Sequence, residues 1–113
     1  MAIPPPGDPS GGTGAGLAGD TPIYIRVPDS EKWIVYSIAA RNQTKAVRIN
    51  FSIGWGNDKA ILESGLQANT SDYVTYQHAG LMLKAGQVLT IDFKSCDLAD
   101  VLEYSYFAEK VRA

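Results

Sequence analysis

The sequence predicts an all-β protein: a single β-sandwich, jelly-roll or immunoglobulin-like, of about seven or eight strands. Beyond residue 20, short β-prone runs alternate with turn residues. The chain has 113 residues, a length that suits one hydrophobic core. Residues 1–20 are instead rich in proline and glycine. We therefore expect an extended N-terminal arm over residues 1–20 and a β-sandwich domain over residues 21–113.

The predicted arm has a composition that does not favour folding on its own. Glycine and proline make up half of residues 1–20, and a run of three prolines is followed by a glycine-rich stretch. Proline runs favour extended polyproline conformation, whereas glycine-rich stretches are flexible. Because the segment has too few apolar side chains to offset its chain entropy, we expect it to be disordered in isolation.

The first predicted strands follow the arm. Ile23–Val27 alternates apolar and polar residues and stops at a proline-containing turn. Trp33–Ala40 is apolar on both faces, which predicts a central strand or one whose second face meets a partner. Its two predicted faces are Trp33 and Val35 on one side and Ile34, Tyr36 and Ile38 on the other.

The middle of the chain contains the clearest strand pattern. In Val47–Trp55, apolar and polar residues alternate with period two, so one face should pack in the core and the other should be exposed to solvent. Asn42–Lys45 has turn-forming residues and is predicted to make the hairpin turn before this strand. After a polar loop, a short strand is expected at Ala60–Leu62.

Four further strands complete the predicted sandwich. Asp72–His78 resumes the alternation, and Leu81–Gln87 is predicted as a strand ending in a tight turn. Val88–Phe93 should pair onward from that turn. The last strand, Val101–Lys110, is rich in aromatic residues, and the segment before it is the one place where a helical turn is expected.

Charge and composition exclude several classes of partner. The net charge is -2 and the basic residues are scattered, which argues against binding to nucleic acid through phosphate neutralisation. No apolar run approaches the roughly 20 residues that span a bilayer, so we expect no membrane partner. The N-terminus lacks the features of a secretory signal.

The residues that usually carry chemistry are sparse and isolated. His78 is the only histidine and Cys96 the only cysteine, so a thiolate metal cluster and an intramolecular disulfide are excluded. Asp97 and Asp100 lack the spacing of a calcium loop and are interpreted as turn residues. We therefore expect no catalytic residue, no metal and no cofactor, and predict that the protein is not an enzyme.

Aromatic residues give a stronger indication of binding. Trp55 lies between two glycines at the end of a strand, where an indole can be exposed. Tyr73 and Tyr104 are further candidates for an interface. Aromatic side chains with a polar tip are enriched at protein interfaces and also stack on sugar rings.

Several motifs occur in a distinctive order, namely I-Y-I-R-V-P at 23–28, K-W-I-V-Y-S-I at 32–38, L-Q-A-N-T-S at 66–71 and L-M-L-K-A-G-Q-V-L at 81–89. This succession resembles the small β-sandwich decoration, or cement, proteins of tailed bacteriophage capsids. The similarity covers about residues 21–107. The chain differs from the pattern in having Gln87 where an aspartate is common, and in a longer polar loop after Trp55.

The resemblance implies a structural virion protein on the capsid surface, often a trimer, which binds the major capsid protein and stabilises contacts between its subunits. Extended termini in such proteins can run across neighbouring capsid subunits. We expect the N-terminal arm to bind in this way, because a proline-rich peptide loses little entropy on docking. The candidate capsid-binding residues in the arm are Ile3, Pro4, Pro5, Pro6 and Leu17.

A second class of function stays open at this stage. A receptor-binding or carbohydrate-binding β-sandwich module of a phage tail, neck or fibre would also suit exposed aromatics and a flexible arm. Oligomeric state separates the two hypotheses, because a particle-bound trimer supports capsid decoration whereas a glycan-binding monomer supports the module.

Overall fold

The computed structural model describes residues 8–55 and 58–112 and has eight β-strands. The strands are β1 (Asp8–Ala15), β2 (Gly19–Arg26), β3 (Glu31–Asn42), β4 (Arg48–Trp55), β5 (Asp58–Leu66), β6 (Val74–Leu83), β7 (Val88–Cys96) and β8 (Val101–Arg112). They form two antiparallel four-stranded sheets, sheet A with the order β1-β8-β3-β6 and sheet B with the order β2-β7-β4-β5. The predicted all-β fold class is confirmed.

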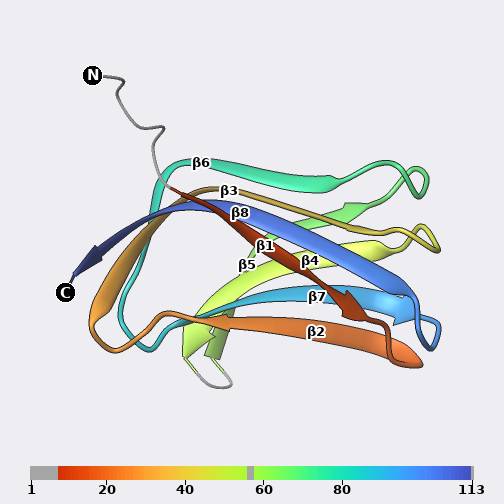
Figure 1. The fold of residues 1–113 in the computed structure, drawn as a ribbon, viewed down its shortest axis with the longest axis horizontal. Helices are drawn as coiled ribbons and strands as arrows, with labels where there is room; N and C mark the ends of the chain where they lie inside the picture. Colours follow the sequence, from red (N-terminus) through yellow and green to blue (C-terminus); the bar gives the residue numbers. More distant parts are fainter. Residues whose placement is uncertain (1–7, 56–57, 113) are drawn as a thin grey trace.

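The chain passes from one sheet to the other at almost every connection. Among the described strands, β4 and β5 are the only consecutive pair that are also neighbours in a sheet. The predicted hairpins before Val47 and after Gln87 are therefore wrong, because both turns carry the chain from sheet A to sheet B. Figure 1 shows the result: the β1–β2, β3–β4, β5–β6 and β7–β8 connections gather at one end of the molecule, here called the loop end.

The two sheets enclose one hydrophobic core to which both contribute. Its largest fully buried side chains include Phe51 and Phe93 from sheet B, and Ile38 and Leu83 from sheet A. Each such side chain contributes about 1.5–3 kcal/mol through removal of apolar surface from water. The alternation predicted for Val47–Trp55 is confirmed on this inner face, since Ile49 is also fully buried.

A bulge in β3 changes which residues of this strand face the core. Trp33 and Val35 are buried, but the pairing register shifts between Val35 and Ser37. The extra residue reverses the alternation, so Ile38 points inward on the same face as Trp33. The sequence prediction had placed Ile38 on the opposite face from Trp33. The strand itself is central, as predicted, between β8 and β6.

Much of the predicted N-terminal arm is part of the folded domain. Residues 8–15 pair with β8 along their whole length, and β2 begins at Gly19. The expected boundary at residue 20 therefore does not coincide with a structural boundary. Residues 1–7 of the predicted arm, which include Ile3, Pro4, Pro5 and Pro6, lie outside the described residues.

Glycine is what allows this segment to lie against the rest of the domain. A Cβ on Gly11 would collide with the backbone carbonyl oxygen of Tyr104, and one on Gly16 would lie 2.8 Å from the Asp97 carbonyl oxygen. The glycines were interpreted as a sign of flexibility. Gly11 in β1 instead permits close approach to β8, and Gly16 just after β1 permits close approach to the β7–β8 loop.

Two of the later elements also differ from expectation. The runs predicted as two strands, Asp72–His78 and Leu81–Gln87, contribute Val74–His78 and Leu81–Leu83 to the single strand β6. The segment after Cys96, where a helical turn was expected, is a tight turn with Ala99 in the left-handed region at φ 69°.

Candidate binding surfaces

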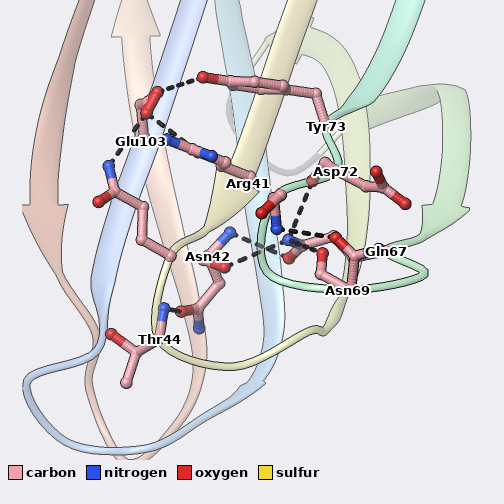
Figure 2. A network of polar contacts seen from close by, with 10 residues as sticks. Arg41, Asn42, Thr44, Gln67, Asn69, Asp72, Tyr73 and Glu103 are labelled. Atoms are coloured by element: carbon pink, nitrogen blue, oxygen red, sulfur yellow. Dashed lines mark hydrogen bonds and ion pairs between the residues drawn. The ribbon is translucent and has the colours of Figure 1, made fainter.

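The loop end is held together by a buried glutamine. The Gln67 side chain is 3% exposed and connects three stretches of backbone (Figure 2). Its Oε1 accepts hydrogen bonds from the backbone N–H groups of Asn42 and Val47, at 2.9 and 3.3 Å. Its Nε2 lies 3.2, 3.3 and 3.1 Å from the carbonyl oxygens of Asn42, Asn69 and Asp72. One side chain thus joins the β3–β4 and β5–β6 connections.

Asn42 extends this network to the β7–β8 loop. It is fully buried, and its Nδ2 donates a 2.9 Å hydrogen bond to the Asp100 carboxylate, which is also buried. Asp100 in turn accepts a hydrogen bond from the backbone N–H of Asp97. Asn42 Oδ1 accepts from the backbone N–H groups of Thr44 and Lys45. Because these polar groups are buried and paired, the loop end is a preorganised surface.

A polar cluster lies beside this network on the outer face of sheet A. The Glu103 carboxylate accepts hydrogen bonds from Tyr73 Oη at 2.6 Å and Gln43 Nε2 at 3.0 Å, and pairs with Arg41 at 3.1 Å (Figure 2). The Arg41 guanidinium also lies 4.8 Å from the Tyr73 ring centroid. The hydrogen bond from Tyr73, and then Arg41, hold the pKa of Glu103 below its ordinary value.

Two exposed leucines stand at the loop end on adjacent segments. Leu17, in the β1–β2 turn, is 57% exposed, and Leu98, in the β7–β8 loop, is 75% exposed. Backbone hydrogen bonds join the two segments, from Gly16 N–H to Asp100 C=O at 2.7 Å and from Ala99 N–H to Gly16 C=O at 2.8 Å. We call Leu17 and Leu98 the leucine tip.

The leucine tip is fixed from both sides. The Leu17 N–H donates a 2.8 Å hydrogen bond to Thr21 Oγ1, which closes the β1–β2 turn. The neighbouring loop is held through Asp100 as described above. An ordered backbone lowers the entropy cost when exposed apolar side chains such as these dock on a partner.

Two of the predicted interface aromatics, Tyr73 and Tyr104, lie in different environments. Tyr73 is 44% exposed, with its hydroxyl bound to Glu103. Tyr104 is partly buried, packs against the core and lies beneath Gly12 of β1, so it is not a free surface aromatic. Trp55 ends β4, and its side chain lies outside the described part of the structure. Tyr73 and Tyr104 therefore do not form one exposed aromatic patch.

The only histidine and the only cysteine of the sequence, His78 and Cys96, lie in different sheets, on β6 and β7. Cys96 is buried, and burial raises the pKa of its thiol, which disfavours the thiolate form. His78 is exposed, and its Nδ1 accepts a hydrogen bond from the backbone N–H of Gly80. Within residues 8–55 and 58–112, no three His, Cys, Asp or Glu side chains are grouped as a metal site. The same residues contain no helix that is long and apolar enough to cross a membrane.

Sequence reasoning singled out Leu17 but missed Leu98, Met82 and Phe107. The last two are 52% and 41% exposed on the outer face of sheet A. Leu98 follows an aspartate in a turn, where an apolar residue has no structural reason to be, and that mismatch is the signal that was available.

No protein-family model matches this chain, and a search of curated proteins finds no match to it.

Proposed function

We propose that this protein is a structural virion protein that binds the outer surface of an assembled bacteriophage capsid and stabilises contacts between major capsid subunits. It works by binding and not by catalysis. The order of motifs along the chain, which resembles that of capsid decoration proteins, supports this proposal. We further infer that the two sheets form a jelly-roll sandwich, an architecture that also occurs in viral capsid domains.

The leucine tip is the observation that carries the proposal. Its two leucines contribute most when they insert into apolar pockets of a partner, at about 1.5–3 kcal/mol for each fully buried side chain. The buried network around Gln67 and Asn42 keeps the surrounding loops in place, so binding costs little ordering of the backbone. We assign the tip to contact with the major capsid protein, together with the arm residues before β1.

The tip can be tested on capsids that lack this protein. The double variant Leu17→Ser and Leu98→Ser should reduce occupancy of such capsids by at least about tenfold, because two apolar contacts are lost. A matched control is Ile61→Ser, since Ile61 is 68% exposed but lies on β5 in sheet B. Occupancy can be measured by sedimenting capsids with the purified protein and quantifying the bound copies.

The arm needs a separate variant that leaves β1 in place. Deletion of residues 2–7 removes Ile3, Pro4, Pro5 and Pro6 but retains the strand that pairs with β8. If the arm clamps neighbouring capsid subunits, this deletion should also lower occupancy. Wild-type occupancy for both the tip variant and the deletion would contradict the assigned contacts, and a failure of the wild-type protein to bind capsids would contradict the proposed function itself.

A further inference from the structure

The central strands of sheet A are apolar on their outer face as well as in the core. Ile34 is half-buried on the outside of β3, where it alternates with core residues. Its register partner on β6, Met82, is 52% exposed, and Phe107 on the neighbouring strand β8 is 41% exposed. A solvated face of an antiparallel sheet is normally polar. We call Ile34, Tyr36, Met82 and Phe107 the sheet A patch.

The bulge in β3 adds the aromatic ring of Tyr36 to this patch. Tyr36 is the residue that the shifted register leaves without a partner on either neighbouring strand. Its hydroxyl donates a 3.3 Å hydrogen bond to the Glu109 carboxylate of β8. On the β6 side, a Cβ on Gly80 would lie 3.3 Å from the Ile34 side chain and 3.9 Å from that of Tyr36. Because Gly80 has no side chain, Ile34 and Tyr36 stay uncovered on that side.

The outer face of sheet B provides a contrast within the same molecule. In the middle of that sheet, the outside of β4 and β7 carries only polar side chains, namely Asn50, Ser52, Thr90, Asp92 and Lys94. The apolar outer surface is therefore a property of sheet A and not of the fold in general. Contiguous exposed apolar patches indicate interaction sites, whereas apolar side chains scattered singly do not.

The charged residues beside the patch match a second copy of the same face. Glu109 is the register partner of Ile34, and Lys32 precedes Ile34 in the outer row of β3. Within residues 8–55 and 58–112, neither Lys32 nor Glu109 forms an ion pair. Nearer the loop end, Arg41 and Glu103 of the same face already neutralise each other at 3.1 Å. Two copies of the face therefore offer each other one unpaired cation and one unpaired anion.

The size of sheet A also suits a contact between two copies. Its strands β1, β3, β6 and β8 have 8, 12, 10 and 12 residues. With about 4.8 Å between strands and about 3.3 Å per residue, the face spans about 650 Å² in projection. The accessible area over its side chains is larger than this projection. The face is thus comparable with the roughly 800 Å² that each partner buries in a standard interface.

We propose that the outer face of sheet A binds a second copy of this chain, across a two-fold axis that runs along the strands between β3 and β8. This axis places β3 of each copy over β8 of the other. Phe107 of one copy then lies against Tyr36 of the other, since Phe107 pairs with Ser37 beside Tyr36. Lys32 of each copy lies near Glu109 of the other. A two-fold contact between identical faces closes at two copies, so the assembly is a dimer and not the trimer that the resemblance implies.

The dimer goes beyond the proposed capsid attachment and does not rest on it. The sheet A patch lies away from the loop end, where β3 ends and β8 begins (Figure 1). Because the axis runs along the strands, both leucine tips point to the same end of the dimer. A dimer on a capsid thus engages two tips at once, which raises its avidity. Purified protein without capsids tests the dimer alone, so either proposal can fail while the other stands.

Sedimentation of the full-length protein tests the dimer. Between about 5 and 500 µM, analytical ultracentrifugation should show a reversible equilibrium between monomer and dimer. Phe107→Ser should weaken dimerisation at least about tenfold, because each dimer loses two buried rings. Ile61→Ser is the matched control, since Ile61 is 68% exposed but lies on sheet B. It should dimerise like the wild type.

A charge exchange tests the placement of the axis. Glu109→Lys should also weaken dimerisation, because the new lysine faces Lys32 of the other copy. Adding Lys32→Glu to this variant should restore it. Glu109 is exposed, so this pair keeps the test valid if Phe107→Ser lowers the urea unfolding midpoint. The proposal is overturned if the protein stays monomeric over the whole range or forms an oligomer other than a dimer. It is also overturned if Phe107→Ser and Glu109→Lys both dimerise like the wild type.

Discussion

At the scale of single residues, Gln67 is the side chain on which the loop end depends most. Its Oε1 accepts hydrogen bonds from two backbone N–H groups. Its Nε2 lies within hydrogen-bonding distance of three backbone carbonyl oxygens. Gln67→Ala leaves these groups unpaired, so we expect a loss of about 2–4 kcal/mol in the free energy of unfolding. Urea denaturation measures this loss.

A neighbouring glutamine provides the control for that measurement. Gln43 is exposed and makes one side-chain hydrogen bond, to Glu103. Gln43→Ala should change the free energy of unfolding by less than about 0.5 kcal/mol. Equal effects of the two substitutions would show that the Gln67 network adds no more stability than a surface contact.

The Glu103 cluster gives a pH-dependent prediction at the same scale. Tyr73 is the largest cause of the lowered Glu103 pKa, so Tyr73→Phe should raise that pKa toward its ordinary value of 4.5. Because the folded state lowers this pKa, the cluster stabilises the fold above the ordinary glutamate range, and the contribution is lost as pH falls through the folded value. NMR titration of the Glu103 carboxyl measures the shift, and an unchanged pKa in the variant would assign the effect to Arg41 instead.

At the scale of elements, β1 shows how glycine can support an edge strand. Gly11→Val should destabilise the protein by about 1–3 kcal/mol, because the new side chain collides with the Tyr104 carbonyl and separates β1 from β8. Hydrogen exchange should then speed up at the β8 amides that bond to β1. Thr13→Val places a similar side chain at an exposed position of the same strand and should leave exchange unchanged.

Most strands after residue 20 were predictable from the sequence, whereas β1 and the pairing of the strands were not. Alternation marks a strand such as β4 locally, and Ile49 and Phe51 are buried as it requires. A turn such as Asn42–Lys45 looks the same whether it closes a hairpin or crosses to the other sheet, because its residues set local geometry only. The β3 bulge and the pairing of β1 depend on contacts with β8, far away along the chain, and short-range patterns do not encode them.

At the scale of the whole molecule, the binding surfaces combine residues that the sequence keeps far apart. Leu17 was identified from the sequence, but the closeness of its segment to that of Leu98 could be recognised only once β1 and the β7–β8 loop were placed together. The outer face of sheet B likewise combines distant residues, since Asn50 and Asp92 lie opposite each other only through the β4–β7 register. The expectation of a solvent-exposed face for Val47–Trp55 is wrong at Ser52, which is only 7% exposed, because burial on an outer face depends on the side chains of neighbouring strands.

The charge of the whole molecule gives the last prediction, on the forces that hold it to a capsid. The net charge is -2, and the proposed contact is apolar. Raising the salt from about 0.1 M to about 1 M shortens the screening length from roughly 10 Å to 3 Å, which weakens charge attraction but not burial of leucines. Capsid occupancy should therefore fall by less than about threefold over this range. A steep loss of occupancy in the sedimentation assay would instead indicate attachment through surface charges such as those of Lys59 and Lys94, and would contradict a contact made chiefly by the leucine tip.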